Sequence, residues 1–322
     1  MDIKDNSGSR KVRGFLTRIG LPAILITGLL LVYTQFFTGD EPDAITELID
    51  VISPVKDSEA KDEETEEEIF EKLDNYLPTS SENQVVSHDH FTLSYIESYE
   101  QAEWVAYELA AEQLEGEKVN RSTSFREDPK VNSGSASPRD YIRSGYDRGH
   151  LAPAADMAFS AEAMRQSFYM SNVSPQVPAF NRGIWRELEE QTRDWSRANK
   201  HLYVVTGPIL AQRAIKRFGP KKGVAAPRSY YKILLDLREP EQKAVAFLLP
   251  NAKSNHRLNE YIVTIDSVEQ LTGIDFFPEL PDELESELES YFDPLRWIYD
   301  EERYQLRVGL WNKQGELAKS YE

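Results

Sequence analysis

Three short runs of β-branched and aromatic residues predict β-strands in the second half of the chain, and each is bounded by glycine, proline or charged residues. The runs cover residues 201–206, 230–237 and 243–249. Two other segments, 160–169 and 185–199, carry apolar residues at helical spacing. Because the strands gather around a few helices without alternating regularly with them, the pattern predicts an α+β fold with a mainly antiparallel sheet.

The segment 91–114 is ambiguous by pattern. Its alanine, glutamate and leucine content favours a strand followed by a helix. The aromatic and β-branched residues of 104–109 instead favour a strand at that point. Both alternatives stay open.

Near the N-terminus, residues 19–37 form a nearly unbroken apolar run, long enough as a helix to span the hydrocarbon core of roughly 30 Å. Basic residues precede the run and acidic residues follow it, so the positive-inside rule predicts a cytoplasmic segment at 1–18 and an extracytoplasmic remainder. We therefore expect a single-pass signal anchor in the cell membrane, with the rest of the chain in the periplasm or cell envelope. A cleaved signal peptide is the alternative, although the run lacks a small-x-small cleavage site.

Composition divides the rest of the chain into three parts. Residues 38–87 are acidic and poor in apolar side chains, which predicts a flexible spacer. Residues 88–280 contain the predicted strands and form the expected folded domain, and residues 281–322 form an acidic extension. Within that extension, 282–292 predicts a solvated amphipathic helix, or alternatively an acidic segment that covers a basic cleft.

The net charge of −18 argues, taken alone, against a polyanionic partner. The charge is unevenly distributed, because residues 118–257 hold 24 basic against 13 acidic side chains while both flanks are acidic. A basic centre can therefore bind anions that the net charge seems to exclude. The chain has no cysteine, which excludes a disulfide scaffold, a thiolate metal site and a thiol nucleophile.

The segment 147–153, DRGHLAP, carries the candidate chemistry. In an extended segment Arg148 and His150 point to the same side. An imidazole that deprotonates water and a guanidinium that holds a phosphate are suited to phosphodiester cleavage. Asn181 and Glu189 lie two helical turns apart downstream, and amide and carboxylate oxygens are ligands that Mg²⁺ accepts.

Several motifs in order resemble the DNA/RNA non-specific endonuclease family, which includes endonuclease G and the secreted Serratia-type nuclease. The resemblance covers about residues 88–280. The motifs are DRGHLAPAADM from 147, FYMSNVSPQ from 168, FNRGIW from 180, VTGP from 205, APRSYYK from 226, LPN from 249 and IDFF from 274. The resemblance implies an antiparallel core with a ββα-metal module that holds one divalent ion.

The resemblance also implies roles for individual residues. His150 matches the general base, and Arg148 matches a phosphate-contacting arginine. Asn181 matches the direct ligand of Mg²⁺, and Glu189 matches the carboxylate that orients metal-bound water; Mn²⁺ or another divalent ion would suit the same ligands. A further catalytic arginine upstream corresponds to Arg121 or Arg126, and the two alternatives stay open. The expected products carry 5′-phosphate ends, the substrates are DNA and RNA, and a homodimer is left open.

Other residues have competing interpretations. Arg182, Lys221 and Lys222 are assigned to substrate binding, although the lysine pair equally suits a solvated loop. His88 and His90 lack a nearby third ligand and are expected to be structural, and Asp147 is expected to support its neighbours rather than act on substrate. The alternative function is a non-catalytic nucleic-acid-binding or envelope scaffold protein that keeps the fold.

Overall fold

The computed structural model describes residues 76–81, 84–210, 216–220, 223–238 and 240–313. The predicted cytoplasmic segment 1–18, the anchor 19–37, most of the spacer 38–87 and the pair Lys221 and Lys222 lie outside the described residues. Within the described part of the chain, no helix combines the length and the apolar character that crossing a membrane requires.

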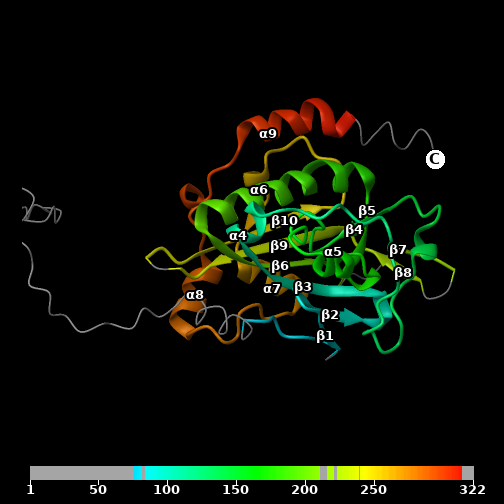
Figure 1. Cartoon of the computed structure of the whole chain (residues 1–322). Helices are drawn as coiled ribbons and strands as arrows, with labels where there is room; N and C mark the ends of the chain where they lie inside the picture. The colour runs from blue at the N-terminus through cyan, green and yellow to red at the C-terminus, as the bar shows by residue number, and fades with distance from the viewer. Residues whose placement is uncertain (1–75, 82–83, 211–215, 221–222, 239, 314–322) are drawn as a thin grey trace, which may run out of the picture. The chain divides into compact units, whose positions relative to one another are not determined.

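A seven-stranded antiparallel sheet forms the centre of the folded part, in the order β1-β2-β3-β6-β9-β10-β11 (Figure 1). Its middle strands are buried along almost their whole length, which is why they appear in the sequence as continuous apolar runs. The predicted antiparallel sheet is therefore confirmed. The strands are β1 Val85–Ser87, β2 Thr92–Ile96, β3 Gln101–Ala110, β6 His201–Pro208, β9 Ser229–Asp236, β10 Lys243–Pro250 and β11 Ile262–Val263.

The ambiguous segment is a strand through residues 104–109. These residues belong to β3, which pairs with β2 on one side and β6 on the other. A short helix, α4 (Ala111–Glu115), follows only after the strand ends. Pairing on both edges satisfies the backbone groups of β3 and overrides the helical preference of its alanine and glutamate residues.

A second, two-stranded sheet lies beside the large one. It pairs β4 (Asp147–His150) with β5 (Val173–Gln176), with α5 (Ala161–Ser167) in the connection. A π-helical turn at Phe180–Ile184 then leads directly into α6 (Trp185–Asn199). This region therefore consists of two antiparallel strands, connected through α5, and a helix that follows them. A third small sheet pairs β7 (Lys216–Phe218) with β8 (Val224–Ala226).

The two faces of the large sheet are covered by different helices. Alternate strand residues point to opposite faces, so Val204 joins the hydrophobic cluster that contains Leu188 of α6, and Val205 joins the other cluster. The second cluster is completed by α7 (Ile265–Thr272) and α8 (Asp282–Ser290), the latter through Leu288. The segment 282–292 thus packs its apolar side on the sheet face away from α6.

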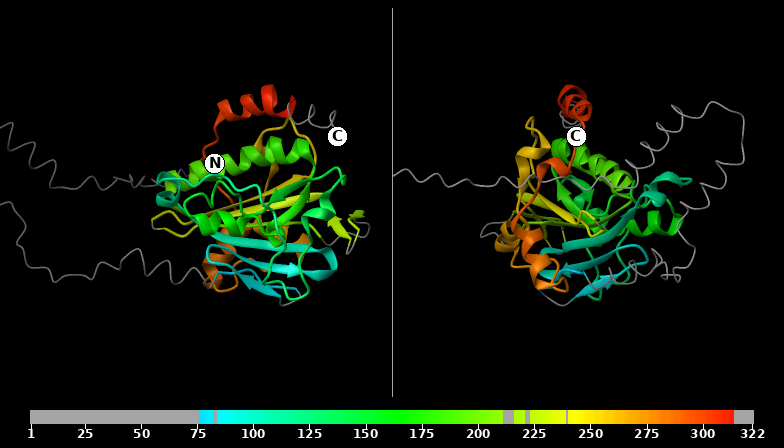
Figure 2. Two further views of the ribbon diagram at one scale, coloured as in Figure 1. Left: turned by 45° about the vertical axis from the view of Figure 1, so that its right-hand side comes forward. Right: turned by 90° about the vertical axis from the view of Figure 1, so that its left-hand side faces the viewer.

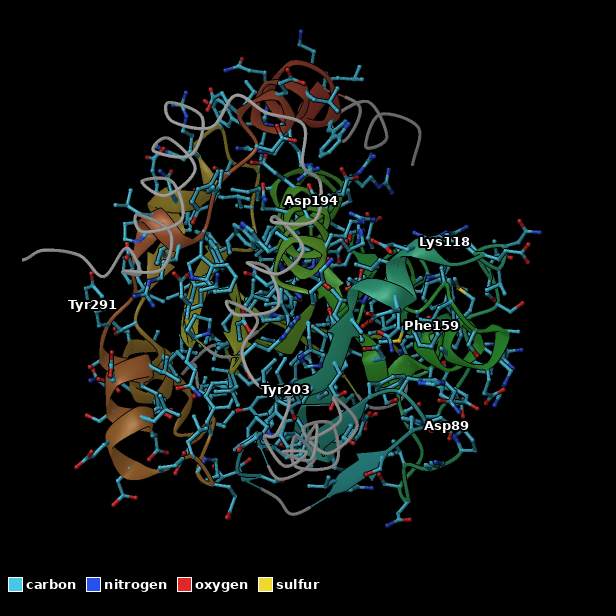
Figure 3. The ribbon with its side chains drawn as sticks, turned by 60° about the vertical axis from the view of Figure 1, so that its left-hand side comes forward. Asp89, Lys118, Phe159, Asp194, Tyr203 and Tyr291 are labelled. Atoms are coloured by element: carbon cyan, nitrogen blue, oxygen red, sulfur yellow. The ribbon has the colours of Figure 1, made fainter. Side chains whose placement is uncertain are left out.

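Residues beyond 280 also pack against α6. Trp297 is fully buried in the same cluster as Leu188, and α9 (Glu301–Leu306) lies over α6 in both views of Figure 2. Arg303 forms an ion pair of 2.5 Å with Asp194, which is labelled on α6 in Figure 3. The described part of the acidic extension, as far as residue 313, therefore packs against the rest of the fold.

Arg307, in the π-helical turn Arg307–Trp311, has no exposed surface. Its guanidinium pairs with the carboxylate of Glu187 and donates to the carbonyl oxygens of Ser254 and His256. A buried charge is tolerated when it is paired and its remaining donors are satisfied. The ion pair joins the C-terminal segment to α6, and the two hydrogen bonds join it to the loop after β10.

Folded structure begins before residue 88 on the other side of the domain. The backbone N–H of Thr79 donates to the carbonyl of Asp275 at 2.8 Å, and the indole of Trp104 donates to the carbonyl of Thr79 at 2.9 Å. Ser81 donates its hydroxyl to Glu103. Residues 76–81 are thus held on the sheet by the β3 strand, and β1 also lies within the segment that composition alone indicated as spacer.

Candidate functional site

The DRGH sequence forms β4, and its glycine is required by the partner strand. A Cβ built on Gly149 would lie 2.2 Å from the side chain of Gln176 on β5, so no larger residue fits without displacing that buried glutamine. The residues after β4 are held by Asn172. Its side chain accepts from the N–H of Ala152 at 2.8 Å and donates to the Ala152 carbonyl at 2.9 Å.

His150 lies in an aromatic pocket at the end of β4. Its ring is 4.7 Å from that of Phe168 and 5.3 Å from that of Phe125, and the residue is 6% exposed. Its Nε2 atom is buried and has no hydrogen-bond partner among the described residues. Burial, together with the positive charges of Arg121 and Arg148, lowers the pKa of His150 to about 3. The imidazole is therefore neutral at neutral pH, and one of its ring nitrogens keeps a lone pair.

Two arginines stand beside this imidazole. The guanidinium of Arg148 lies 4.4 Å from the centre of the Phe125 ring, and that of Arg121 lies 5.4 Å from the centre of the Phe168 ring. Both arginines are exposed, so their charged ends are available to an anion. The rings that enclose His150 thus also orient the two cations next to it.

Asn181 and Arg182 are both held by Asp147. The Nδ2 of Asn181 donates to Asp147 Oδ2 at 2.9 Å, and Arg182 donates to the two carboxylate oxygens at 2.9 and 2.7 Å. Because the amide nitrogen faces Asp147, the Oδ1 of Asn181 is the atom left to bind a cation or water. The structure therefore places Arg182 in an ion pair at the rim, and Asp147 beneath Asn181 as a supporting residue.

Glu189 faces a buried charge network that the sequence did not reveal. Its neighbours are Arg193, Lys232 and Asp156, and burial is the largest cause that raises the pKa of Glu189. Arg193 donates to Asp156 at 2.8 Å, and Tyr107 donates to the other oxygen of that carboxylate at 2.8 Å.

Lys232 completes the network from the centre of the large sheet. It has no exposed surface, donates to Thr206 Oγ1 at 2.6 Å, and has its pKa lowered by burial. A lysine in the middle of an apolar strand, as in YYKILLDL, is the sequence signal that could have indicated a buried partner.

A cavity of about 90 Å³ brings the predicted residues together, and a larger one of about 500 Å³ adjoins it through shared residues. Arg121 lines both cavities, whereas Arg126 lines neither and places its guanidinium over the ring of Tyr169. Of the two arginines that the sequence left open, position therefore favours Arg121. The smaller cavity is lined by Arg121, Arg148, His150, Pro153, Ala154, Ala155, Asn181 and Glu189.

The larger cavity extends toward the C-terminal segment. Its lining includes Arg182, Arg186 and Trp311, and the guanidinium of Arg186 lies 3.9 Å from the centre of the Trp311 ring. Trp311, which lies beyond the predicted domain, thus contributes to the wall of the larger cavity.

The residues of the smaller cavity fit a hard divalent cation. Asn181 presents an amide oxygen that Asp147 fixes in direction, and Glu189 presents a carboxylate on the same wall. Oxygen ligands with room for water are the set that Mg²⁺ prefers. His88 takes no part in this site, because its Nε2 lies 2.9 Å from the carboxylate of Asp128.

Comparison with known proteins is consistent with this geometry. The DNA/RNA non-specific endonuclease family matches residues 72–283. "Endonuclease G, mitochondrial" of Homo sapiens is 35% identical over 209 residues, covering 61% of this chain and 70% of that protein. A "Nuclease" of Nostoc sp. is 33% identical over 233 residues, covering 68% and 80%.

A solved structure is also similar. It is described as "Crystal structure of the EndoG/EndoGI complex: Mechanism of EndoG inhibition", and it superposes with a TM-score of 0.58 at 30% identity. The match covers 62% of this chain and 88% of that chain. Most of the C-terminal segment, including Trp297, Arg307 and Trp311, lies beyond the residues that the family matches.

Proposed function

Because this chain belongs to the DNA/RNA non-specific endonuclease family, we propose that it hydrolyses phosphodiester bonds of DNA and RNA at the cavity around His150. The observation that carries the proposal is the Nε2 of His150, which is buried, neutral and unpartnered among the described residues, next to two exposed arginines. A neutral imidazole nitrogen with no structural hydrogen bond can accept a proton from water as that water attacks the phosphate.

Each residue of the cavity then has a chemical task. His150 Nε2 takes a proton from the attacking water, while Arg148 and Arg121 hold the phosphate oxygens and oppose their charge. Asp147 keeps the amide of Asn181 in place and binds the guanidinium of Arg182 at the rim. Attack by water at phosphorus with departure of the 3′-oxygen leaves 5′-phosphate and 3′-hydroxyl ends.

Asn181 Oδ1 and the carboxylate of Glu189 are the atoms that would hold Mg²⁺, or Mn²⁺ in its place. When bound, such an ion polarises the phosphate and stabilises the leaving oxygen. The buried network of Arg193, Lys232 and Asp156 fixes the charge environment of Glu189 from behind.

The charge distribution supports a polymeric substrate. Residues 118–257, which include the cavity residues Arg121 and Arg148, hold 24 basic against 13 acidic side chains, and a nucleic acid requires several phosphates to be neutralised at once. The apolar run at 19–37 supports an anchor in the cell membrane that keeps the nuclease domain outside the cytoplasm.

Digestion of supercoiled plasmid and of RNA by the full-length chain tests the activity, with Mg²⁺ or with EDTA. We expect cleavage of both substrates in Mg²⁺ and none in EDTA. The variant His150→Gln should lose at least about a hundredfold in rate, the usual contribution of general-base catalysis.

The matched control is His256→Gln, which changes an exposed histidine that pairs with Glu260 outside the cavity. It should cut at the wild-type rate. An inert wild type that still binds DNA would support the scaffold alternative, and equal cutting by His150→Gln would contradict the assigned base.

A further inference from the structure

Five carboxylates converge on the sheet face opposite α6. Glu289, near the end of α8, lies within 4.8 Å of the carboxylate oxygens of Asp266 and Glu269 on α7. Its carboxylate also lies within 4.8 Å of the carboxylate oxygens of Asp275 and Glu285. Glu289 is therefore shared by two groups of three acids.

Nothing among the described residues neutralises this cluster. The charges that act on Glu289 are those of the four other carboxylates, and no described lysine, arginine or histidine forms an ion pair with any of the five. Glu285 and Glu289 are also four residues apart on one helix, where like charges repel. Glu289 stands in the last turn, where the helix dipole disfavours a negative charge.

Glu289 supplies an independent sign of a missing partner. The residue is only 7% exposed, and its Oε1 is buried without any hydrogen-bond partner in the described structure. That oxygen belongs to the carboxylate common to both groups of acids. Burial, and then the surrounding carboxylates, raise the pKa of Glu289 to about 8.

We propose that α7 and α8 form a binding site for a calcium-like divalent cation, with Glu289 as the central ligand and Asp266, Glu269, Asp275 and Glu285 around it. Carboxylate oxygens without nitrogen or sulfur ligands select a hard cation, and Ca²⁺ accepts six to eight oxygens in flexible geometry. Loosely arranged acids on two helices suit Ca²⁺ better than Mg²⁺, which requires a near-octahedral arrangement.

The site is separate from the His150 cavity. Figure 1 shows α8 at the far end of the fold from β4 and β5. In Figure 3 its last residues lead to Tyr291, on the opposite side from Phe159. Asp275 also binds Thr79 through its backbone at 2.8 Å, so a cation here would join α8 to the segment 76–81 as well as to α7. Its expected role is to stabilise the fold.

The test is thermal unfolding of the full-length chain with CaCl₂, MgCl₂ or NaCl of equal ionic strength. For a dissociation constant near 0.1 mM, about 10 mM Ca²⁺ should raise the unfolding midpoint by roughly 5 to 10 °C. Mg²⁺ should raise it less, and NaCl should give only the small effect of screening.

Four variants test whether the Ca²⁺ response originates at this cluster. Glu289→Gln should lose the response to Ca²⁺, and Glu285→Gln should weaken it at least tenfold in the Ca²⁺ concentration required. Glu283→Gln, on the same helix outside the cluster, and Asn181→Ala, in the other site, should both keep the response. Cleavage of plasmid by Glu289→Gln at the wild-type rate would show that this variant is folded.

Two results would overturn the proposal. One is an equal response to Ca²⁺ and to NaCl by the wild type, with Glu289→Gln more stable than wild type in the absence of divalent ions. In that case a proton on Glu289, and not a cation, would reduce the repulsion between the carboxylates. The other is an unchanged Ca²⁺ response in both Glu289→Gln and Glu285→Gln.

Discussion

Replacing Asp147 by alanine tests whether this residue positions the proposed metal ligand. Asp147 accepts three hydrogen bonds, one from Asn181 at 2.9 Å and two from Arg182 at 2.9 and 2.7 Å. Without it, the Asn181 amide is free to rotate, and the oxygen that should face the cation is no longer fixed. Loss of such a supporting partner costs about 10- to 100-fold in metal affinity, which is about 1.4 to 2.7 kcal/mol.

The assay is the rate of plasmid relaxation measured over a range of Mg²⁺ concentrations. Asp147→Ala should raise the half-saturating Mg²⁺ concentration about 10- to 100-fold, while the rate at saturating Mg²⁺ falls much less. Asp147→Asn keeps one acceptor oxygen for Asn181 and should recover part of the affinity. A purely structural role would lower the maximal rate without this shift.

Asp194→Ala is the matched control, because Asp194 also pairs with arginine on α6 but lies outside the cavity lining. It should leave the Mg²⁺ dependence unchanged. The reasoning fails if Asp147→Ala keeps the wild-type half-saturating concentration, or if Asp194→Ala shifts it by a similar factor.

Three further predictions concern stability. His150 has a pKa of about 3 in the folded chain against roughly 6.5 in the unfolded chain. Between these pH values the unfolded chain binds more protons, so the contribution of His150 to stability is lost as pH falls. In urea unfolding, the difference in free energy of unfolding between wild type and His150→Gln should change between pH 7 and pH 5, and a constant difference would contradict the lowered pKa. Arg307→Met leaves Glu187 buried without its partner and should lower the free energy of unfolding by about 3 to 5 kcal/mol. The double variant with Glu187→Gln should recover part of this loss. Calorimetry that finds no change in Arg307→Met would refute the buried pair. Gly149→Ala should cost about 1 to 3 kcal/mol by overpacking against Gln176, and Gln176→Ala should relieve that cost if the contact is the cause.

The sequence was sufficient to predict the strands and helices whose pattern lies within one short run of residues. The strand runs at 201–206 and 243–249 and the helix at 185–199 were predicted close to their observed limits. Burial on both faces of a strand leaves a continuous apolar run, and burial of one face of a helix leaves apolar residues at helical spacing. Residues 104–109 could not be assigned in this way. Their conformation depends on pairing with β6, whose residues lie about a hundred positions later.

Part of the candidate site could be predicted from the sequence for the same reason. Arg148 and His150 are neighbours in sequence, and the structure brings Asn181 and Glu189 to the same cavity. The position that favours Arg121 over Arg126 depends on how a loop packs against Phe168, and no spacing rule predicts such packing. The network behind Glu189 joins Asp156 and Lys232 from separate elements, so only the tertiary fold brings their charges together.

The contact between Glu187 and Arg307 also has a consequence for biosynthesis. The two residues are 120 positions apart, and ribosomes release the chain from its N-terminus. Until Arg307 has been made and has left the ribosome, α6 carries a carboxylate without its partner, and burial of that carboxylate is opposed. The wall of the cavity that contains Trp311 is formed by the same late segment. The wall of the larger cavity is therefore completed only after residue 311 has left the ribosome, later than the strands of the sheet that supports it.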